Sequence, residues 1–93
     1  MRYYVYILVS RVDGSLYTGQ TEDLEGRLKR HNAGQIHSTK GKKPYDLGYF
    51  EENQTRAEAM WREWELKKKW NTERKKKLIA SFDRSRTKKV PGL

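Results

Sequence analysis

Apolar and polar residues alternate in a regular way near the start of the chain. Tyr3–Ser10 is aromatic and β-branched, with apolar side chains at both alternating sets of positions. This pattern predicts a central strand that is buried on two faces. Asp13-Gly14 is a strong hairpin-turn signal, so residues 16–20 are predicted to return as the antiparallel neighbour.

A short amphipathic helix is predicted after this hairpin. Thr21 is placed to cap its N-terminus, and Leu24 and Leu28 recur at the spacing of a buried helical face. Asn32-Ala33-Gly34 is typical of a helix end. Gly26 costs about 1 kcal/mol relative to alanine inside a helix, so tertiary packing has to hold this segment.

A basic loop, a third strand and a long helix are predicted to follow the first helix. Residues 34–44 form a basic, glycine-containing loop, and residues 45–51 are predicted to be a third strand. Thr55-Arg56-Ala57-Glu58 is a capping box that opens a long helix. The apolar stripe of this helix is predicted to consist of Ala57, Met60, Trp61 and Trp64.

A second helix is predicted to begin at Asn71-Thr72 and to run to about Phe82, with Leu78 and Ile79 also facing inward. The resulting order is β-β-α-β-α-α, an α+β fold with a three-stranded antiparallel sheet flanked by helices. We expect one domain over residues 1–82 and a flexible basic tail over residues 83–93, with fraying at Val90-Pro91-Gly92.

Composition restricts the chemistry that such a small domain can perform. The 93 residues include no cysteine, which excludes disulfides, thiolate metal sites and a cysteine nucleophile. No P-loop, dinucleotide-binding glycine motif, HExxH zinc motif or G-x-S-x-G elbow is present. The apolar run at the N-terminus stops at Val9, which is too short for a signal peptide or a membrane span. We therefore expect a monomeric cytoplasmic protein without a membrane partner.

Charge adds a candidate partner. Lysine and arginine number 21 against 12 acidic residues, a formal net charge of +9. Such a field attracts polyanions, chiefly nucleic acid, although a merely solubilising surface is the plain alternative. The basic residues cluster, which favours a binding face: Lys40, Lys42 and Lys43 in the loop, Lys67, Lys68 and Lys69 on the long helix, and residues 74–77 after it.

Two tyrosines are predicted to share one face of the sheet. If Asp13-Gly14 forms the centre of the turn, Tyr17 lies opposite Ser10, and Tyr6 lies on the same face because side chains alternate. Their backbones would be about 13 Å apart at 3.3 Å per residue. A one-residue bulge would instead place them on opposite faces, and either tyrosine alone is an ordinary strand residue.

Three further polar residues could join them. Arg27 and His31 are four residues apart, so they stack on one face of the first helix beside its buried stripe. Glu63 falls about 60° from Met60 around the long helix, at the flank of the predicted stripe. Its carboxylate could hold a divalent cation, or it could be a surface charge paired with Lys67. Tyrosine, arginine, histidine and glutamate together suit phosphodiester hydrolysis.

The order and spacing of these residues resemble the GIY-YIG nuclease domain, and most closely its small stand-alone bacterial members. The resemblance covers residues 2 to about 80 and is carried by Tyr4-Val5-Tyr6, by Tyr17-Thr18-Gly19, by Arg27 and His31 on the next helix, and by Glu63 on a later one. Tyr4 stands where the name-giving glycine of the family would be, and Thr18 replaces its isoleucine. Asn71 is a candidate for the asparagine that follows the glutamate in many family members, and it is equally a candidate helix cap.

The resemblance implies a role for each residue. Tyr17 with His31 would activate the attacking water, and Tyr6 would orient the water or the phosphate. Arg27 would stabilise charge on the phosphoryl oxygens, and Glu63 would be the protein ligand of one Mg²⁺ or Mn²⁺ ion. A metal-dependent DNA endonuclease or nickase, acting in repair or processing, is then expected. The alternatives are a non-catalytic nucleic-acid-binding module and a nuclease that needs a protein partner for targeting.

Overall fold

A three-stranded antiparallel sheet is the centre of the computed structural model, which describes residues 2–90 and 93. Its strands are β1 (Tyr3–Ser10), β2 (Leu16–Thr21) and β3 (Tyr45–Asn53), in the order β2-β1-β3. The helices are α1 (Leu24–Asn32), α2 (Arg56–Lys68) and α3 (Thr72–Ala80), with short 3₁₀ helices η1 (Lys40–Lys42) and η2 (Arg84–Lys89). The predicted α+β fold is confirmed.

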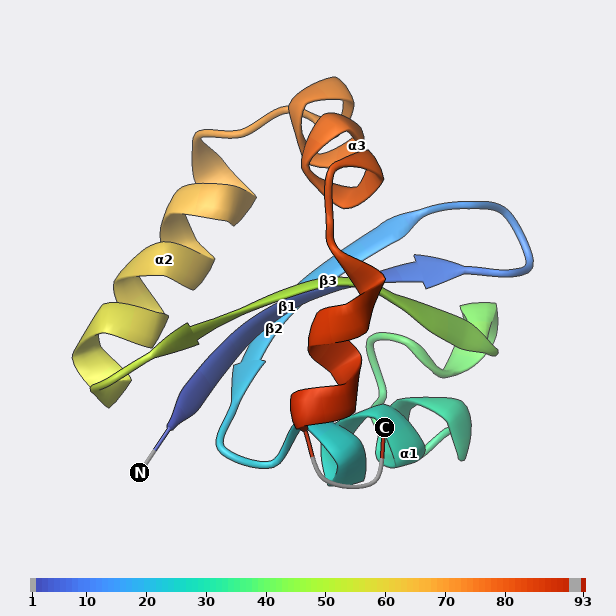
Figure 1. Cartoon of the computed structure of the whole chain (residues 1–93). Coiled ribbons are helices and arrows are strands. Elements are labelled where there is room, and N and C mark those ends of the chain that lie inside the picture. Colours follow the sequence, from blue (N-terminus) through green and yellow to red (C-terminus); the bar gives the residue numbers. More distant parts are fainter. Residues whose placement is uncertain (1, 91–92) are drawn as a thin grey trace.

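Both faces of the sheet are covered, as the apolar pattern of β1 predicted. Tyr4, Tyr6 and Leu8 face one core, which also contains Leu24 of α1. Val5 and Ile7 face a second core with Ala59 and Leu66 of α2 and the partly buried side chains of α3. In Figure 1, α1 lies on one side of the sheet and α2 and α3 lie on the other. No helix among the described residues is long and apolar enough to cross a bilayer.

The β1–β2 register differs from the prediction by an even number of residues. Tyr17 lies opposite Leu8, not Ser10. Ser10 pairs instead with Ser15, whose carbonyl accepts from Ser10 N at 2.9 Å, so the turn takes in residues 11–14, with Gly14 at φ +75°. Because side chains alternate with a period of two, this shift keeps Tyr6 and Tyr17 on one face and brings them closer along the strands.

The N-terminus of α1 is capped by Asp23, so the prediction that Thr21 is the cap is wrong. The Asp23 carboxylate accepts from Gly26 N at 3.0 Å, while Thr21 Oγ1 accepts from Asp23 N. A Cβ on Gly26 would lie 2.2 Å from Asp23 Oδ2. Glycine is therefore compatible with a cap that folds back over the first turn, which offsets its low helix propensity.

The apolar stripe predicted for α2 is on the wrong side of the helix. Ala59 and Leu66 are fully buried, whereas Met60, Trp61 and Trp64 are 54%, 64% and 42% exposed. The helix sits against Val5 and Ile7 through its smaller side chains. Its inner flank includes a charged residue, Arg62, which is neutralised by Glu51 and Glu65, and such pairing makes burial of a guanidinium tolerable.

The two predicted caps on the C-terminal helices are present. Thr55 and Glu58 form the capping box of α2, and the Asn71 side chain accepts from Arg74 N at 2.8 Å at the start of α3. Asn71 is thus a structural cap. A helix N-terminus needs such an acceptor because its first N–H groups have no partner within the helix.

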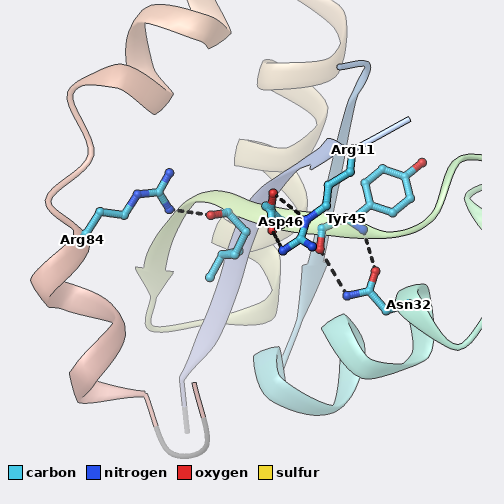
Figure 2. Close-up of polar contacts among 6 residues, drawn as sticks. Arg11, Asn32, Tyr45, Asp46 and Arg84 are labelled. Carbon is cyan, nitrogen blue, oxygen red and sulfur yellow. Dashed lines mark hydrogen bonds and ion pairs between the residues drawn. The ribbon is translucent and has the colours of Figure 1, made fainter. Parts of the chain in front are cut away.

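Side-chain hydrogen bonds fasten the ends of the elements to β3. Asn32 at the end of α1 accepts from Tyr45 N and donates to the Tyr45 carbonyl, and Arg11 pairs with Asp46 (Figure 2). Arg84 in η2 donates to the Leu47 carbonyl from the other direction (Figure 2).

The C-terminal segment contains structure that the sequence pattern did not predict. Residues 84–89 form η2, and Phe82 and Val90 are buried in the core on the α1 face. A domain boundary at residue 82 stays a prediction, and Pro91 and Gly92 of the segment expected to fray lie outside the described residues.

Candidate active site at the edge of β2

Tyr6 and Tyr17 form the centre of the candidate site. Their ring centroids are 6.4 Å apart, with Tyr6 on β1 and Tyr17 on the neighbouring strand β2. Tyr6 is 1% exposed and Tyr17 is half-buried, so only the second ring has substantial access to solvent. The shift in hairpin register is what makes this approach possible.

Gly19 is required beside Tyr6 for a steric reason. It lies directly opposite Tyr6 in the β1–β2 pair, and the phenol passes across its Cα. A Cβ at this position would lie 2.5 Å from the Tyr6 hydroxyl oxygen and 2.6 Å from Cζ. Glycine in the Tyr17-Thr18-Gly19 stretch therefore makes room for the Tyr6 hydroxyl.

His31 is fully buried behind Tyr6. Its Nε2 is 2.9 Å from the Tyr6 hydroxyl and its Nδ1 is 2.8 Å from Thr39 Oγ1. Because the Thr39 hydroxyl donates to the Ile36 carbonyl, the proton of the neutral imidazole belongs on Nδ1. Nε2 is then the acceptor and the Tyr6 hydroxyl is the donor.

The protonation of this pair follows from its surroundings. Burial, reinforced by the charge of Arg27, lowers the pKa of His31 to about 4, so the imidazole is neutral at pH 7. Burial raises the pKa of Tyr6 to about 12, although the nearby Arg27 guanidinium acts in the opposite direction and the charge of Glu63 reinforces burial. Tyr6 is thus a neutral phenol that senses both charged residues of the candidate site.

Arg27 has a donor with no protein partner. Its side chain is half-buried, and its Nε is buried without a hydrogen-bond acceptor in the described part of the chain. Arg27 also lines an open pocket, together with Gln20, Thr21, Glu22, Asp23 and Arg56. A buried unpaired donor is costly, so an anion that entered the pocket and accepted from Arg27 would relieve that cost.

Glu63 approaches the site from the opposite face of the sheet. Its Oε2 is 3.0 Å from Lys67 Nζ, and the same ammonium lies 5.7 Å from the centroid of the Tyr17 ring. Lys67 therefore connects the carboxylate on α2 with the tyrosine on β2. The Glu63–Lys67 pairing is the surface-charge alternative that the spacing of four residues left open.

Glu63 is the candidate ligand for a divalent cation. Among the described residues no group of three or more His, Asp or Glu side chains could hold a metal ion. Mg²⁺ keeps several waters and can be bound through one or two carboxylates, so a single half-buried glutamate fits an ion of this kind. Lys67 would have to leave the carboxylate for the ion to bind.

The candidate phosphate-binding lysines are not brought together. Lys67 and Lys68 are on α2, whereas Lys40, Lys42 and Lys43 surround η1, on the opposite side of the molecule in Figure 1. Lys42 is 3.0 Å from Asp13 of the hairpin turn, and the Lys43 side chain packs against Gly34.

The sequence reasoning missed Thr39. This residue is 1% exposed and fixes the orientation of His31, but it lies in a loop where no periodicity distinguishes it from its neighbours. The reasoning also missed the requirement for Gly19 opposite Tyr6. The correct hairpin register, which places Gly19 opposite Tyr6, is the signal that would have indicated it.

This chain is similar to known proteins in sequence and, for one solved structure, in fold. A UPF0213 protein of Staphylococcus saprophyticus is 42% identical over 80 residues, which cover 85% of this chain and 95% of that protein. A UPF0213 protein of Staphylococcus aureus is 46% identical over 66 residues, 70% of this chain and 79% of that one. The solution NMR structure of a UPF0213 protein from Bacillus halodurans superposes with a TM-score of 0.54 at 37% identity, covering 86% of this chain and 84% of that one.

A family model matches most of the chain. Residues 2–77 match the GIY-YIG catalytic domain, so the match includes Tyr6, Tyr17, Arg27, His31 and Glu63. Domains of this kind form a nuclease family that acts on nucleic acid and generally uses a divalent metal. With most of its length matched and its small size shared with the UPF0213 proteins, the chain belongs to the GIY-YIG domain family.

Proposed function

We propose that the protein is a metal-dependent endonuclease that hydrolyses DNA phosphodiester bonds. The observation that carries this proposal is the buried, unpartnered Nε of Arg27 beside the hydrogen-bonded Tyr6–His31 pair. The guanidinium can bind a phosphate, and the pair can accept a proton, so the two requirements of the reaction meet at one place.

The hydrogen bonding supports Tyr6 as the proton relay. The attacking water forms the new P–O bond and gives its proton to the Tyr6 hydroxyl oxygen, while the Tyr6 proton moves to His31 Nε2. The bond to the 3′-oxygen breaks and leaves a 5′-phosphate, the 3′-oxygen takes a proton from solvent to become a hydroxyl, and His31 returns its extra proton to solvent. Tyr17, whose ring centroid lies 5.0 Å from that of His31, positions the water or the phosphate from the exposed side.

Substrate binding would make this relay easier. The positive charge of Arg27 is one of the two causes that hold the pKa of His31 low. A phosphate on Arg27 neutralises that charge and so raises the affinity of His31 for a proton. The relay thus gains strength when the substrate is in place.

Glu63 is the residue that would hold the divalent cation. When bound, such an ion supplies charge stabilisation at the leaving oxygen of the phosphodiester. Lys67, released from Glu63, is close enough to Tyr17 to pair with a phosphate next to the cleaved bond.

Nicking of supercoiled plasmid DNA tests the proposal. Arg27→Ala or Glu63→Gln should lower the nicking rate by about 100-fold or more, because each removes a charge that acts on the transition state. Removal of divalent cations with EDTA should abolish nicking by the wild type. The matched controls are Arg30→Ala, on the exposed side of α1, and Glu73→Gln, on α3; both should nick at the wild-type rate.

Thermal denaturation of the four variants separates loss of chemistry from loss of fold. The proposal requires nearly unchanged midpoints for Arg27→Ala and Glu63→Gln. Nicking that survives both substitutions contradicts the mechanism.

A non-catalytic nucleic-acid-binding module is the second candidate. The observation that favours it is the Glu63–Lys67 ion pair, because the lysine occupies the carboxylate that is proposed as the metal ligand. In that case DNA binding is indifferent to Mg²⁺ and to Glu63→Gln, and no nicking occurs at any metal concentration. Nicking that requires an added protein would indicate a partner-dependent nuclease instead.

A further inference from the structure

The outer face of α2 carries an exposed aromatic cluster that the proposed chemistry does not use. Trp61 and Trp64 stack on each other with ring centroids 5.1 Å apart and an interplanar angle of 25°. They are 64% and 42% exposed, and Met60 beside them is 54% exposed. We call these three residues the tryptophan face. Two stacked, solvent-exposed tryptophans are unusual on a surface helix, and exposed apolar patches of this kind mark interaction sites.

Uncompensated positive charge lies next to the tryptophan face. Lys68 follows Trp64 by one helical turn, and Lys69 Nζ is 5.6 Å from the centroid of the Trp64 ring. Within the described residues neither lysine forms an ion pair. The acids of α2 are engaged elsewhere: Glu58 in the capping box, Glu63 with Lys67 and Glu65 with Arg62. The face therefore combines aromatic surface with net positive charge.

The tryptophan face is continuous with the candidate active site around the helix. At 100° per residue, Met60 lies about 60° from Glu63, and Lys67 falls between them. Lys67 in turn reaches the Tyr17 ring at 5.7 Å. Lys67, which is close to Tyr17, thus lies about one helical turn after Trp64, next to the tryptophan face.

We propose that the tryptophan face binds unpaired nucleotides of a single-stranded nucleic acid. A nucleobase stacks on the open face of the Trp61–Trp64 pair, and Lys68 and Lys69 contact the flanking phosphates. Base stacking on aromatic side chains together with lysine contacts to the backbone is the usual chemistry of single-strand recognition. A blunt duplex offers no free base face, so the surface distinguishes strands with unpaired nucleotides from continuous duplex.

The substrate preference that follows rests on the proposed nuclease function, but the binding surface does not. Because Lys67 joins the tryptophan face to Tyr17, a strand that enters the active site extends onto this face. DNA with an unpaired stretch next to the cleaved bond is then the favoured substrate class.

Binding without cleavage tests the surface. Fluorescence anisotropy is measured in EDTA with a labelled oligothymidylate of about eight nucleotides and with a blunt hairpin duplex, because single-strand sites of this type cover about 4–16 nucleotides. The double variant Trp61→Ala/Trp64→Ala should bind the oligothymidylate about ten-fold or more weakly and should bind the duplex as the wild type does. Trp61→Phe/Trp64→Phe should keep most of the affinity because it keeps two stacking rings.

Val12→Ala is the matched control, since Val12 is an equally exposed apolar residue on the distant hairpin turn. It should leave both affinities unchanged. The salt dependence of oligothymidylate binding should be the same for the double alanine variant and the wild type, because the phosphate contacts remain.

Three results would overturn the proposal. The first is that the double alanine variant binds the oligothymidylate with wild-type affinity. The second is that this variant loses as much affinity for the blunt duplex as for the oligothymidylate. The third is that the wild type self-associates in sedimentation and the double alanine variant does not, which would identify a second copy of the chain as the occupant. Failure of the proposed nuclease function gives a different result. If Glu63→Gln and the wild type both fail to nick DNA yet bind the oligothymidylate through the tryptophans, the proposed function is wrong and the proposed binding surface is retained.

Discussion

His31 shows how a single buried residue couples the candidate site to stability. Its imidazole is 0% exposed and hydrogen-bonded at both nitrogens, to Tyr6 and Thr39, in the neutral form. Protonation would leave Nε2 as a second donor facing the Tyr6 hydroxyl and would add a positive charge near Arg27. The hydrogen bonds that prepare the relay are therefore the ones that oppose protonation of His31.

Stability should consequently fall in acid through His31. The pKa of this group is lowered from 6.5 to about 4 in the folded protein, so the unfolded chain binds the proton first. Its contribution to the free energy of unfolding is complete above pH 6.5 and is lost as the pH falls towards 4, by up to about 3 kcal/mol. Urea denaturation of the wild type and of His31→Gln at about pH 7 and pH 4 measures it: the stability advantage of the wild type should shrink by about that amount.

NMR provides the control for this expectation. In the variant His37→Gln the one remaining imidazole is His31, and its Cε1 proton should titrate near pH 4. A midpoint at the ordinary value of 6.5, or a stability difference that does not change with pH, contradicts the account.

At the scale of the element, α2 shows that the most hydrophobic side of a helix need not be the buried one. Its buried contacts come from Ala59 and Leu66, and its tryptophans face solvent. The helix can pack this way because Arg62 on the inner flank is neutralised by Glu51 and Glu65. Packing against the sheet thus leaves the larger apolar side free for another role.

Two substitutions distinguish the buried face of α2 from the exposed one. Leu66→Ala should lower the free energy of unfolding by about 2–5 kcal/mol, because it leaves a cavity against the sheet. Met60→Ala, one of the residues predicted from the sequence to be buried, should change it by less than about 0.5 kcal/mol. Denaturant unfolding of the two variants measures both values, and a larger loss for Met60→Ala would restore the sequence-based orientation.

At the scale of the whole molecule, the candidate phosphate-binding lysines lie in two separate regions. Lys67 and Lys68 are on α2, and Lys40, Lys42 and Lys43 are around η1 on the opposite side of Figure 1. The longest dimension of the molecule is 32 Å. About ten base pairs of duplex span a comparable length, so only a nucleic acid of that size can contact both regions at once.

The salt dependence of binding should therefore depend on ligand length. For an oligonucleotide of about four nucleotides, Lys67→Gln/Lys68→Gln should reduce the slope of log K against log salt by about 1–2, and substitution of the three η1 lysines should not change it. For a duplex of about 15 base pairs, both sets should reduce the slope. Anisotropy titrations over a range of salt concentrations measure these slopes, and an effect of the η1 set on the short ligand would show that the regions act as one.

Much of the fold could be predicted because it depends on local patterns. Several features depend only on neighbouring residues: the two-faced apolar run of β1, the Asp13-Gly14 turn signal, the capping box at Thr55 and Glu58, and the positive-φ Gly34 that follows the end of α1. The shared face of Tyr6 and Tyr17 was predicted from side-chain alternation and the assumed position of the Asp13-Gly14 turn, and it survived a register shift because the shift was even.

The sequence by itself determined the α+β class, the order of the elements and the residues that could carry chemistry. Only the tertiary structure decided which of those residues meet. It hydrogen-bonded His31 to Tyr6 with the Tyr17 ring 5.0 Å away, left Arg27 Nε without an acceptor among the described residues, placed Lys67 between Glu63 and Tyr17, and turned the tryptophans of α2 outward. The physical reason is that turn and cap signals lie in near neighbours along the chain, whereas strand register, burial, side-chain pairing and pKa depend on segments that are distant along the chain.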